Sequence, residues 1–281
     1  ILHCAFIGFG KSTTRYHLPY VLHRKDRWQV AHIYRRRAKP EEQAPQYSHI
    51  HFTSDLEEVL NDPLVKLVVV CTHADSHFEY AKKALEAGKN VLVEKPFTPT
   101  LEEAKTLFAL ANSKGLTVTP YQNRRFDSCF LTTKKVIESG KLGELVEIES
   151  HFDNYRPLAE TNPGGPQNGE FYGLGVHTLD QIISLFGRPD HVSYDLRSLR
   201  NKANPDDTFE AQLFYGDMKA IVKTSHLVQI DYPKFIVHGH KGSFVKYGID
   251  QQETSLKANI MPGEPGFGAD DSVGELVYVN E

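Results

Sequence analysis

The residues with the clearest chemistry lie near the start of the chain, where residues 7–14 read IGFGKSTT. Gly8 and Gly10 match the first two glycines of the G-x-G-x-x-G turn that binds dinucleotides, and the letters GKS match the end of an NTP-binding P-loop. Each match lacks one glycine, because Thr13 stands at the third dinucleotide position and Ala5 at the first P-loop position. The stretch therefore predicts a phosphate-binding loop of one of two kinds.

The position of the preceding strand favours the dinucleotide turn. A P-loop needs a wide loop between the strand and the lysine, whereas residues 6–9 include the strand end itself. A dinucleotide turn begins where the strand ends, at Gly8, and its second glycine lets the backbone approach the pyrophosphate. Lys11, Ser12 and Thr13 then lie at a helix N-terminus, which favours anions. A glycine turn without a ligand is the alternative from this stretch alone.

The end of the second predicted strand distinguishes the two dinucleotides. NAD sites place an Asp or Glu there to accept hydrogen bonds from the ribose, but this strand ends with Tyr34 followed by Arg35, Arg36 and Arg37. Guanidinium groups pair with a dianionic 2′-phosphate, which a carboxylate would repel. We therefore predict NADP(H) as the preferred cofactor and NAD(H) as a second one, with Arg35 as the first phosphate ligand and Arg36 and Lys11 beside it. A solvated basic turn is the alternative.

The elements that position these loops alternate along the first 120 residues. Short apolar runs predict strands and the amphipathic stretches between them predict helices, an alternation typical of βαβ units with a parallel sheet. Capping-box spacing at 54–57 and 100–103 marks two helix starts, and Gly88 and Gly115 mark two helix ends. The predicted strands are 4–7, 29–34, 66–71, 90–93 and 116–119.

The regular alternation of predicted strands and helices ends after residue 121. Predicted helices at 125–139 and 171–187 flank a strand at 145–155, and strand-like runs joined by short Gly or Asp turns follow from Pro189. Strands joined in this way are antiparallel neighbours. The predicted class is α/β, with an N-terminal Rossmann domain carrying a parallel sheet at 1–120, followed by an α+β domain with a largely antiparallel sheet at 121–281.

Composition limits the classes of partner. With 281 residues, 40% hydrophobic and 24% charged, the chain can bury one large or two ordinary cores. Its net charge of −4 gives no overall attraction to nucleic acid or anionic lipid, which leaves a small-molecule partner. Three cysteines without C-x-x-C spacing indicate reduced thiols, and no apolar run approaches the roughly 18 residues of a membrane span. We expect a soluble cytoplasmic protein with no membrane or nucleic-acid partner.

Four motifs occur in order along the chain: the glycine turn, C-T-x-x-x-x-H at 71–77, E-K-P at 94–96 and G-x-H-x-x-D at 175–180. In this order and spacing, over nearly the whole chain, they resemble the Gfo/Idh/MocA family of NAD(P)-dependent oxidoreductases. The resemblance implies an open-faced second sheet that often mediates oligomer contacts, so we expect a homo-oligomer, a dimer or tetramer. Because related chains continue further, it also implies that the second domain is C-terminally incomplete after Glu281.

The resemblance assigns the reacting centre to Lys95 and His177. Lys95 would lie beside the nicotinamide and hold the reacting hydroxyl or carbonyl, and the carboxyl edge of a parallel strand is where such sheets bind ligands. An ammonium there donates to a developing alkoxide. His177 would transfer the proton, since imidazole titrates near neutral pH. From sequence alone, a surface lysine and a packed core histidine are the alternatives.

Other site residues follow from the same motifs. Asp180 lies three residues after His177 and is expected to orient its ring or to bind substrate hydroxyls. The remaining cofactor-binding residues are assigned at the loops after the predicted strands, and they are Gly8, Gly10, Lys11, Ser12, Thr13, Arg35, Arg36, Thr72, His77, Glu94, Lys95, Gln122 and Asn123.

The sequence departs from the family at Gly173. Many members carry an Asp there, four residues before the histidine, as part of a Lys-Asp-His arrangement. Tyr172, Asp153 and Tyr155 are the candidates to complete the proton relay, and Tyr155 and Arg156 are expected to contact a polyol or an acid. Substrate-binding residues are therefore predicted as Asp180, Tyr155, Arg156 and Tyr172.

A metal site at the histidine pair of residues 73 and 77 is the other interpretation of this segment, and the sequence does not favour it. His73 and His77 have the i, i+4 spacing of a metal pair, but Ala74 replaces the general base of H-E-x-x-H and no third ligand is evident.

The sequence predicts an NADP(H)-dependent oxidoreductase acting on a CH–OH group of a sugar, cyclitol or small polyol. The alternative is a regulator of the same fold that binds NAD(P) without catalysis.

Overall fold

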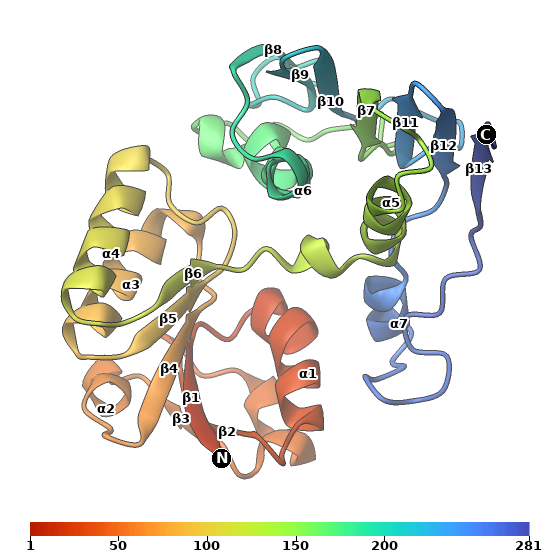
Figure 1. The fold of residues 1–281 in the computed structure, drawn as a ribbon. Helices are drawn as coiled ribbons and strands as arrows, with labels where there is room; N and C mark the ends of the chain where they lie inside the picture. Colours follow the sequence, from red (N-terminus) through yellow and green to blue (C-terminus); the bar gives the residue numbers. More distant parts are fainter. Residues whose placement is uncertain (281) are drawn as a thin grey trace. The chain divides into compact units, whose positions relative to one another are not determined.

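The computed structural model describes residues 1–280, which divide into two compact units (Figure 1). The first unit comprises residues 1–121 together with 255–267. The second comprises residues 122–254 and the chain from Gly268 onward. The short segment at 255–267 thus returns to the first unit from within the second half of the sequence.

A six-stranded parallel sheet forms the centre of the first unit, in the order β3-β2-β1-β4-β5-β6. From β1 the chain adds β2 and β3 on one side and then crosses over to add β4, β5 and β6 on the other, which is the doubly wound Rossmann order. The strands are β1 (Leu2–Ile7), β2 (Trp28–Tyr34), β3 (His51–Thr53), β4 (Val65–Val70), β5 (Asn90–Val93) and β6 (Val118–Pro120).

Helices cover both faces of this sheet, as Figure 1 shows. In β1, Ala5 and Ile7 pack towards α2, α3 and α4, while Cys4 and Phe6 pack towards α1, and all four are buried. This two-sided burial explains why the strands read as continuous apolar runs. The helical elements are η1 (Thr13–His17), α1 (Leu18–His23), η2 (Pro40–Gln43), η3 (Pro45–Tyr47), α2 (Leu56–Leu60), η4 (Ala74–Ser76), α3 (His77–Glu86) and α4 (Leu101–Ser113).

The helix boundaries follow local chemistry. Thr100 and Glu103 form the predicted capping box of α4, and Gly88 and Gly115 adopt left-handed conformations after their helices, with φ of 77° and 65°. The predicted cap at Ser54 is wrong by one residue. Asp55 caps α2 instead, because its carboxylate accepts a hydrogen bond of 2.9 Å from the Glu57 N–H. The strand β3 was not predicted from the sequence.

A seven-stranded sheet dominates the second unit, in the order β13-β12-β11-β7-β10-β9-β8. All neighbours are antiparallel except β7 and β10, which run parallel. The sheet is therefore mixed and mostly antiparallel, as predicted, and Gly216 makes the turn between β9 and β10 with a φ of 59°. The strands are β7 (Leu145–His151), β8 (His191–Arg197), β9 (Thr208–Tyr215), β10 (Met218–Ser225), β11 (Phe235–Gly239), β12 (Gly242–Lys246) and β13 (Gly274–Tyr278).

Two helices, α5 and α6, pack against one face of this sheet (Figure 1). Phe130 of α5 and Ile182 of α6 join a buried cluster with inward-facing strand residues such as Ile148 and Phe209. The opposite face carries ion pairs between strands, for example Lys219 with Glu147. The helical elements are η5 (Asn123–Phe126), α5 (Ser128–Glu138), η6 (Pro166–Asn168), η7 (Phe171–Gly175), α6 (Val176–Phe186) and α7 (Gln252–Lys257).

Candidate active site

The loops after β1, β2, β4 and β5 meet at one edge of the first unit's sheet. Parallel strands point their carboxyl ends to the same edge, and the strand order reverses between β1 and β4. Ligands of such sheets bind at this reversal. Gly8, Arg35, Thr72 and Lys95 each lie within two residues of one of these four strand ends.

Gly8 and Gly10 show why the first loop needs its glycines. Gly8 has a φ of 110°, and a Cβ there would lie 2.5 Å from the carbonyl oxygen of Cys71 at the end of β4. A side chain at Gly10 would meet no protein atom within 4 Å, so packing does not require glycine at that position. An open second glycine leaves room for a ligand's pyrophosphate to approach the backbone, so the loop fits a dinucleotide.

The hydroxyl groups of this loop point into the protein. Thr13 is fully buried, and its hydroxyl donates to the Gly8 carbonyl at 2.8 Å. Ser12 donates to the carboxylate of Glu94 at 2.5 Å. These two side chains therefore shape the turn from inside the protein.

Glu94 is a buried carboxylate that connects the segment after β1 with the turn that carries Lys95. One oxygen lies 2.8 Å from Nε2 of His17, and the other accepts a hydrogen bond of 3.0 Å from the Lys95 backbone N–H. Burial alone would raise its pKa, but the hydrogen bonds from His17 and Ser12 hold the pKa of Glu94 below its ordinary value. Glu94 thus positions Lys95 through the backbone. No sequence motif indicates His17, because its partner lies 77 residues away along the chain.

His77 holds the other side of the same turn. Its ring is buried, with Nδ1 2.8 Å from the Pro96 carbonyl oxygen and Nε2 3.1 Å from the Thr72 carbonyl oxygen. The loop after β4 and the turn that carries Lys95 are therefore joined through one imidazole. Both Glu94 and His77, which the sequence assigns to cofactor binding, contact protein groups on either side of Lys95.

The basic run after β2 is more ordered than its sequence suggests. Arg35 pairs with Glu42 through two hydrogen bonds of 2.7 and 3.1 Å, and this pairing raises the pKa of the guanidinium. Lys39 reaches back to the glycine loop, where its ammonium donates to the Phe9 carbonyl at 2.5 Å. Arg36 is exposed and forms no ion pair within residues 1–280. Glu42 and Lys39 are therefore additional residues at this edge that the motifs did not indicate.

The predicted substrate residues lie in the second unit. His177 is buried near the start of α6, in the turn that follows η7. Both carboxylate oxygens of Asp180, which the sequence assigns to the His177 ring or the substrate, accept hydrogen bonds of 2.7 Å from Arg125. The sequence did not indicate this pairing, which joins α6 to the segment before α5.

The other predicted residues lie on three separate segments. Tyr155 is about half exposed and forms an isolated bridge with Leu227, next to an exposed Arg156. Tyr172 lies in η7. Gln122 and Asn123 begin the second unit, and the buried side-chain oxygen of Gln122 has no hydrogen-bond partner within the described chain. Asp153, a candidate for the proton relay, accepts from the Ser225 N–H and lies 3.1 Å from the His151 ring.

A glycine turn at the reversal point of a Rossmann sheet, followed by a mixed open-faced sheet, defines an NAD(P)-binding oxidoreductase. Two family models match the chain: the NAD-binding Rossmann domain of the oxidoreductase family covers residues 2–122, and its C-terminal alpha/beta domain covers 134–280. The chain belongs to the Gfo/Idh/MocA family of oxidoreductases.

Relatives agree with this assignment. The chain is 87% identical to the uncharacterized oxidoreductase YhhX of Escherichia coli, over all of this chain and 81% of that protein. It is 36% identical to the scyllo-inositol 2-dehydrogenase (NADP(+)) IolW of Bacillus subtilis, over 94% of this chain and 74% of the relative. The crystal structure of an oxidoreductase from Bacillus cereus, 50% identical, superposes with a TM-score of 0.96 over all of this chain and 81% of that one.

Within the described chain, no helix combines the length and the apolar character needed to cross a bilayer.

Proposed function

We propose that this oxidoreductase is NADP(H)-dependent and moves hydride to or from a hydroxyl-bearing carbon of a sugar, cyclitol or related small polyol. The observation that supports it most is Lys95, which Glu94 and His77 fix from two sides at the carboxyl edge of β5. Such fixation suits a side chain that must meet a reacting oxygen with defined geometry. The relative IolW, whose name states an NADP-dependent dehydrogenase of scyllo-inositol, supports a polyol substrate.

Lys95 and His177 have separate roles in this proposal. The Lys95 ammonium donates a hydrogen bond to the substrate oxygen and stabilises negative charge that develops there. His177 accepts or returns the hydroxyl proton. When bound, the nicotinamide supplies the hydride acceptor or donor, and the chain's residues supply position and proton transfer.

The NADP preference rests on the residues after β2. Arg35 and Arg36 are proposed to hold the 2′-phosphate, with Glu42 fixing the guanidinium plane of Arg35. The exposed Arg36 brings a positive charge that no carboxylate in the described chain neutralises. Neither residue offers the carboxylate acceptor typical of an NAD site.

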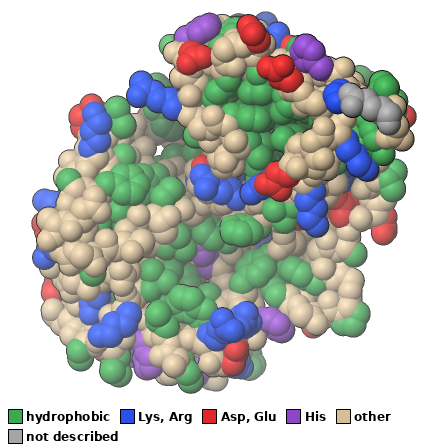
Figure 2. All heavy atoms as spheres, viewed as in Figure 1, with side chains coloured by type: hydrophobic (Ala, Val, Ile, Leu, Met, Phe, Trp, Pro, Cys, Tyr) green, Lys and Arg blue, Asp and Glu red, His purple; other side chains and the backbone are tan. Residues whose placement is uncertain are grey.

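The assembly and location of the protein are proposed from its exposed apolar side chains and its cysteines. Figure 2 shows apolar side chains gathered among charged ones on the second unit, and β8 exposes Val192 and Tyr194. Exposed apolar side chains of this kind support a homo-oligomer, either a dimer or a tetramer, which light scattering would measure. Three buried free cysteines fit a cytoplasmic protein with reduced thiols.

The experiment for the proposed function is a substrate panel with both nucleotides. NADPH and NADH binding is measured first by fluorescence titration. Reduction of NADP+ and NAD+ is then followed with inositols, sugars and sugar acids. We expect turnover of at least one polyol, faster with NADP+. Tight nucleotide binding without turnover of any panel member would favour the alternative, a non-catalytic NAD(P)-binding regulator of the same fold.

A further inference from the structure

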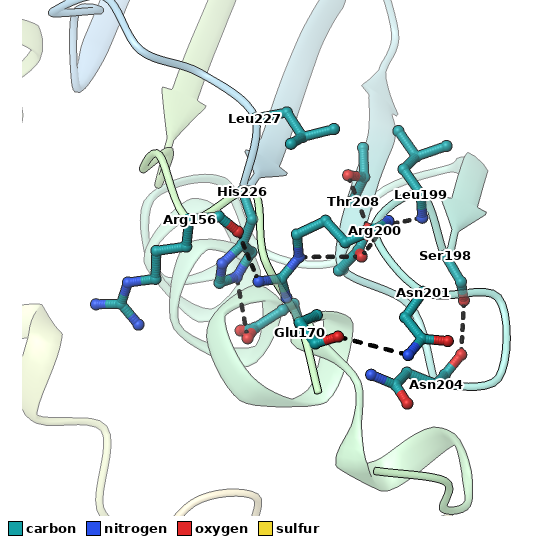
Figure 3. A network of polar contacts seen from close by, with 12 residues as sticks. Arg156, Glu170, Ser198, Leu199, Arg200, Asn201, Asn204, Thr208, His226 and Leu227 are labelled. Atoms are coloured by element: carbon teal, nitrogen blue, oxygen red, sulfur yellow. Dashed lines mark hydrogen bonds and ion pairs between the residues drawn. The ribbon is translucent and has the colours of Figure 1, made fainter. Parts of the chain in front are cut away.

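A buried histidine and a glutamate meet in the second unit, just beyond the end of β10. His226 follows β10 directly, and its Nε2 lies 3.0 Å from a carboxylate oxygen of Glu170, the residue before η7. Figure 3 shows the two side chains pointing toward one another. The His226 side chain is 5% exposed and the Glu170 side chain is 29% exposed. The imidazole is therefore buried, while solvent or a ligand can reach the carboxylate.

The backbone around His226 is fixed by a loop from β8 to β9. The Arg156 N–H donates to the His226 carbonyl at 2.8 Å, and Arg200 donates to the Arg156 carbonyl at 2.9 Å (Figure 3). Arg200 in turn pairs with the buried Asp207 at 3.1 Å. Burial would raise the pKa of Asp207, but hydrogen bonds from the Leu199 and Arg200 N–H groups hold it below its ordinary value.

The same loop also fixes the other member of the pair. The Glu170 N–H donates to the backbone carbonyl of Asp206 at 2.9 Å, and the Phe171 N–H donates to the Asp206 carboxylate at 2.7 Å. These contacts satisfy donors at the start of the helix. Residues 198–207 therefore position Glu170 and His226 together, which is more support than a surface ion pair receives.

Gly173 explains where the Glu170 carboxylate lies. A Cβ added at Gly173 would stand 3.1 Å from a carboxylate oxygen of Glu170, so this carboxylate covers the glycine. Gly173 precedes His177 by four residues, and residues at that spacing share a helix face. The Glu170 carboxylate thus occupies the place that a short acidic side chain at position 173 would reach.

We propose that Glu170, supported by His226, is the substrate-site carboxylate of this enzyme. It accepts a hydrogen bond from a hydroxyl of the bound polyol next to the one that reacts at His177. A carboxylate oxygen is a strong acceptor for such a group, and the contact with His226 holds the side chain in place. This inference rests on the proposed function, because it needs a hydroxyl-bearing substrate.

The test moves the carboxylate from one position to the other. Four proteins are compared: wild type, Glu170→Ala, Gly173→Asp and the double variant. On the panel substrate with the highest wild-type rate, Glu170→Ala is expected to lower kcat/KM by about 10- to 100-fold. Gly173→Asp alone is expected to lower it too, because two carboxylates then compete for one place. The double variant is expected to recover to within about fivefold of wild type.

Two controls separate substrate binding from structure. NADPH affinity should stay unchanged in all four proteins, and Glu160→Ala, which removes an exposed carboxylate from the neighbouring segment, should keep wild-type kcat/KM. Wild-type kcat/KM in Glu170→Ala, or no recovery in a folded double variant, would overturn the proposal. A purely structural pair would change the melting temperature and leave kcat/KM intact.

Melting temperatures of the same four proteins need no substrate. If positions 170 and 173 share one carboxylate place, Gly173→Asp should lower Tm by about 3 °C more in wild type than in Glu170→Ala. Additive Tm changes would overturn the placement of the carboxylate. A wild-type protein that binds NADPH but turns over no panel member would instead contradict the proposed function, and the two failures are thus distinguishable.

Discussion

In the first unit, the groups at the candidate site come from loops that follow neighbouring strands of one parallel sheet. Ser12, Glu94 and Thr72 are far apart in sequence, yet the strand order brings their loops to one edge. In the second unit, the corresponding contacts join residues in or just before the helices η7 and α6 to residues of η5 and of the segment after β10. Asp180 meets Arg125 and Glu170 meets His226 through side-chain pairs, and backbone hydrogen bonds also hold the segment of Glu170. Sheet topology fixes the first set, while individual local contacts fix the second.

This difference has an energetic side. The Glu94–His17 pair is buried on both sides, with exposed fractions of 9% and 5%, whereas Arg125 of the Arg125–Asp180 pair is 48% exposed. Breaking a buried pair leaves an uncompensated charge, but an exposed pair is screened by water. Variants in the first unit should therefore have larger effects than equivalent variants in the second.

The largest effect is expected at Lys95. Lys95→Ala removes the donor to the reacting oxygen, and we expect kcat/KM to fall about 1,000-fold, the order found for loss of an oxyanion donor. NADPH affinity should stay within about twofold, because the loop after β1 is the segment proposed to hold the pyrophosphate. Steady-state kinetics and fluorescence titration measure the two quantities. Lys105→Ala, at an exposed position on α4, is the control, and unchanged turnover in Lys95→Ala would end this mechanism.

Glu94→Gln should have the next largest effect, on stability. It leaves His17 without its carboxylate partner, and we expect a loss of about 3 kcal/mol in the free energy of unfolding. Because the pKa of Glu94 is below the ordinary 4.5, its contribution is present above pH 4.5 and is lost as pH falls through the folded-state pKa. Wild type should therefore lose more stability than Glu94→Gln between pH 6 and about pH 3 in urea unfolding.

A control and a contrary outcome are available for this prediction. Glu86→Gln removes an exposed carboxylate in the same unit and should change stability by less than about 0.5 kcal/mol. If the free energy of unfolding changes with pH in the same way in wild type and Glu94→Gln, the prediction is contradicted. The pKa of Glu94 would then not be lowered by folding.

Much of this architecture could be predicted from the sequence because its signals are local. The continuous apolar runs predicted five of the six strands of the first unit, and the glycines at 8 and 10 predicted the turn. The capping box at Thr100 also formed as expected. Partners that lie far along the chain could not be predicted, because no local pattern indicates that His17 meets Glu94 or that Arg35 is paired with Glu42.

The second unit shows the same limit more strongly. The sequence identified Asp180 and Gly173 as residues that matter, but neither Arg125 nor Glu170 carried a pattern of its own. The return of 255–267 to the first unit had no signal either, since those residues form turns and one short helix end. Contacts that depend on tertiary packing become visible only once the elements are assembled.

A smaller effect is expected at the nucleotide's ribose. Arg36→Glu places a negative charge where the 2′-phosphate is proposed to bind, and NADPH affinity should fall about 30-fold, or roughly 2 kcal/mol. NADH affinity should change less than threefold, because it lacks that phosphate. Arg27→Glu, at the amino end of the same strand, is the matched control. Equal losses for both nucleotides would refute the 2′-phosphate assignment.

The smallest effect is expected for the pair that joins α6 to the segment before α5. Arg125 and Asp180 have good bidentate geometry, but Arg125 is 48% exposed, so their coupling energy should be below about 1 kcal/mol. A double-mutant cycle with Arg125→Ala and Asp180→Ala, read out by urea unfolding, measures this energy. Asp180 is also a predicted substrate residue, so the same four proteins should show a larger coupling in kcat/KM than in stability if Asp180 contacts the polyol. A coupling energy near the loss of about 3 kcal/mol expected for Glu94→Gln would contradict the contrast between the two units. It would mean that the exposed pair holds its residues as firmly as the buried pair does.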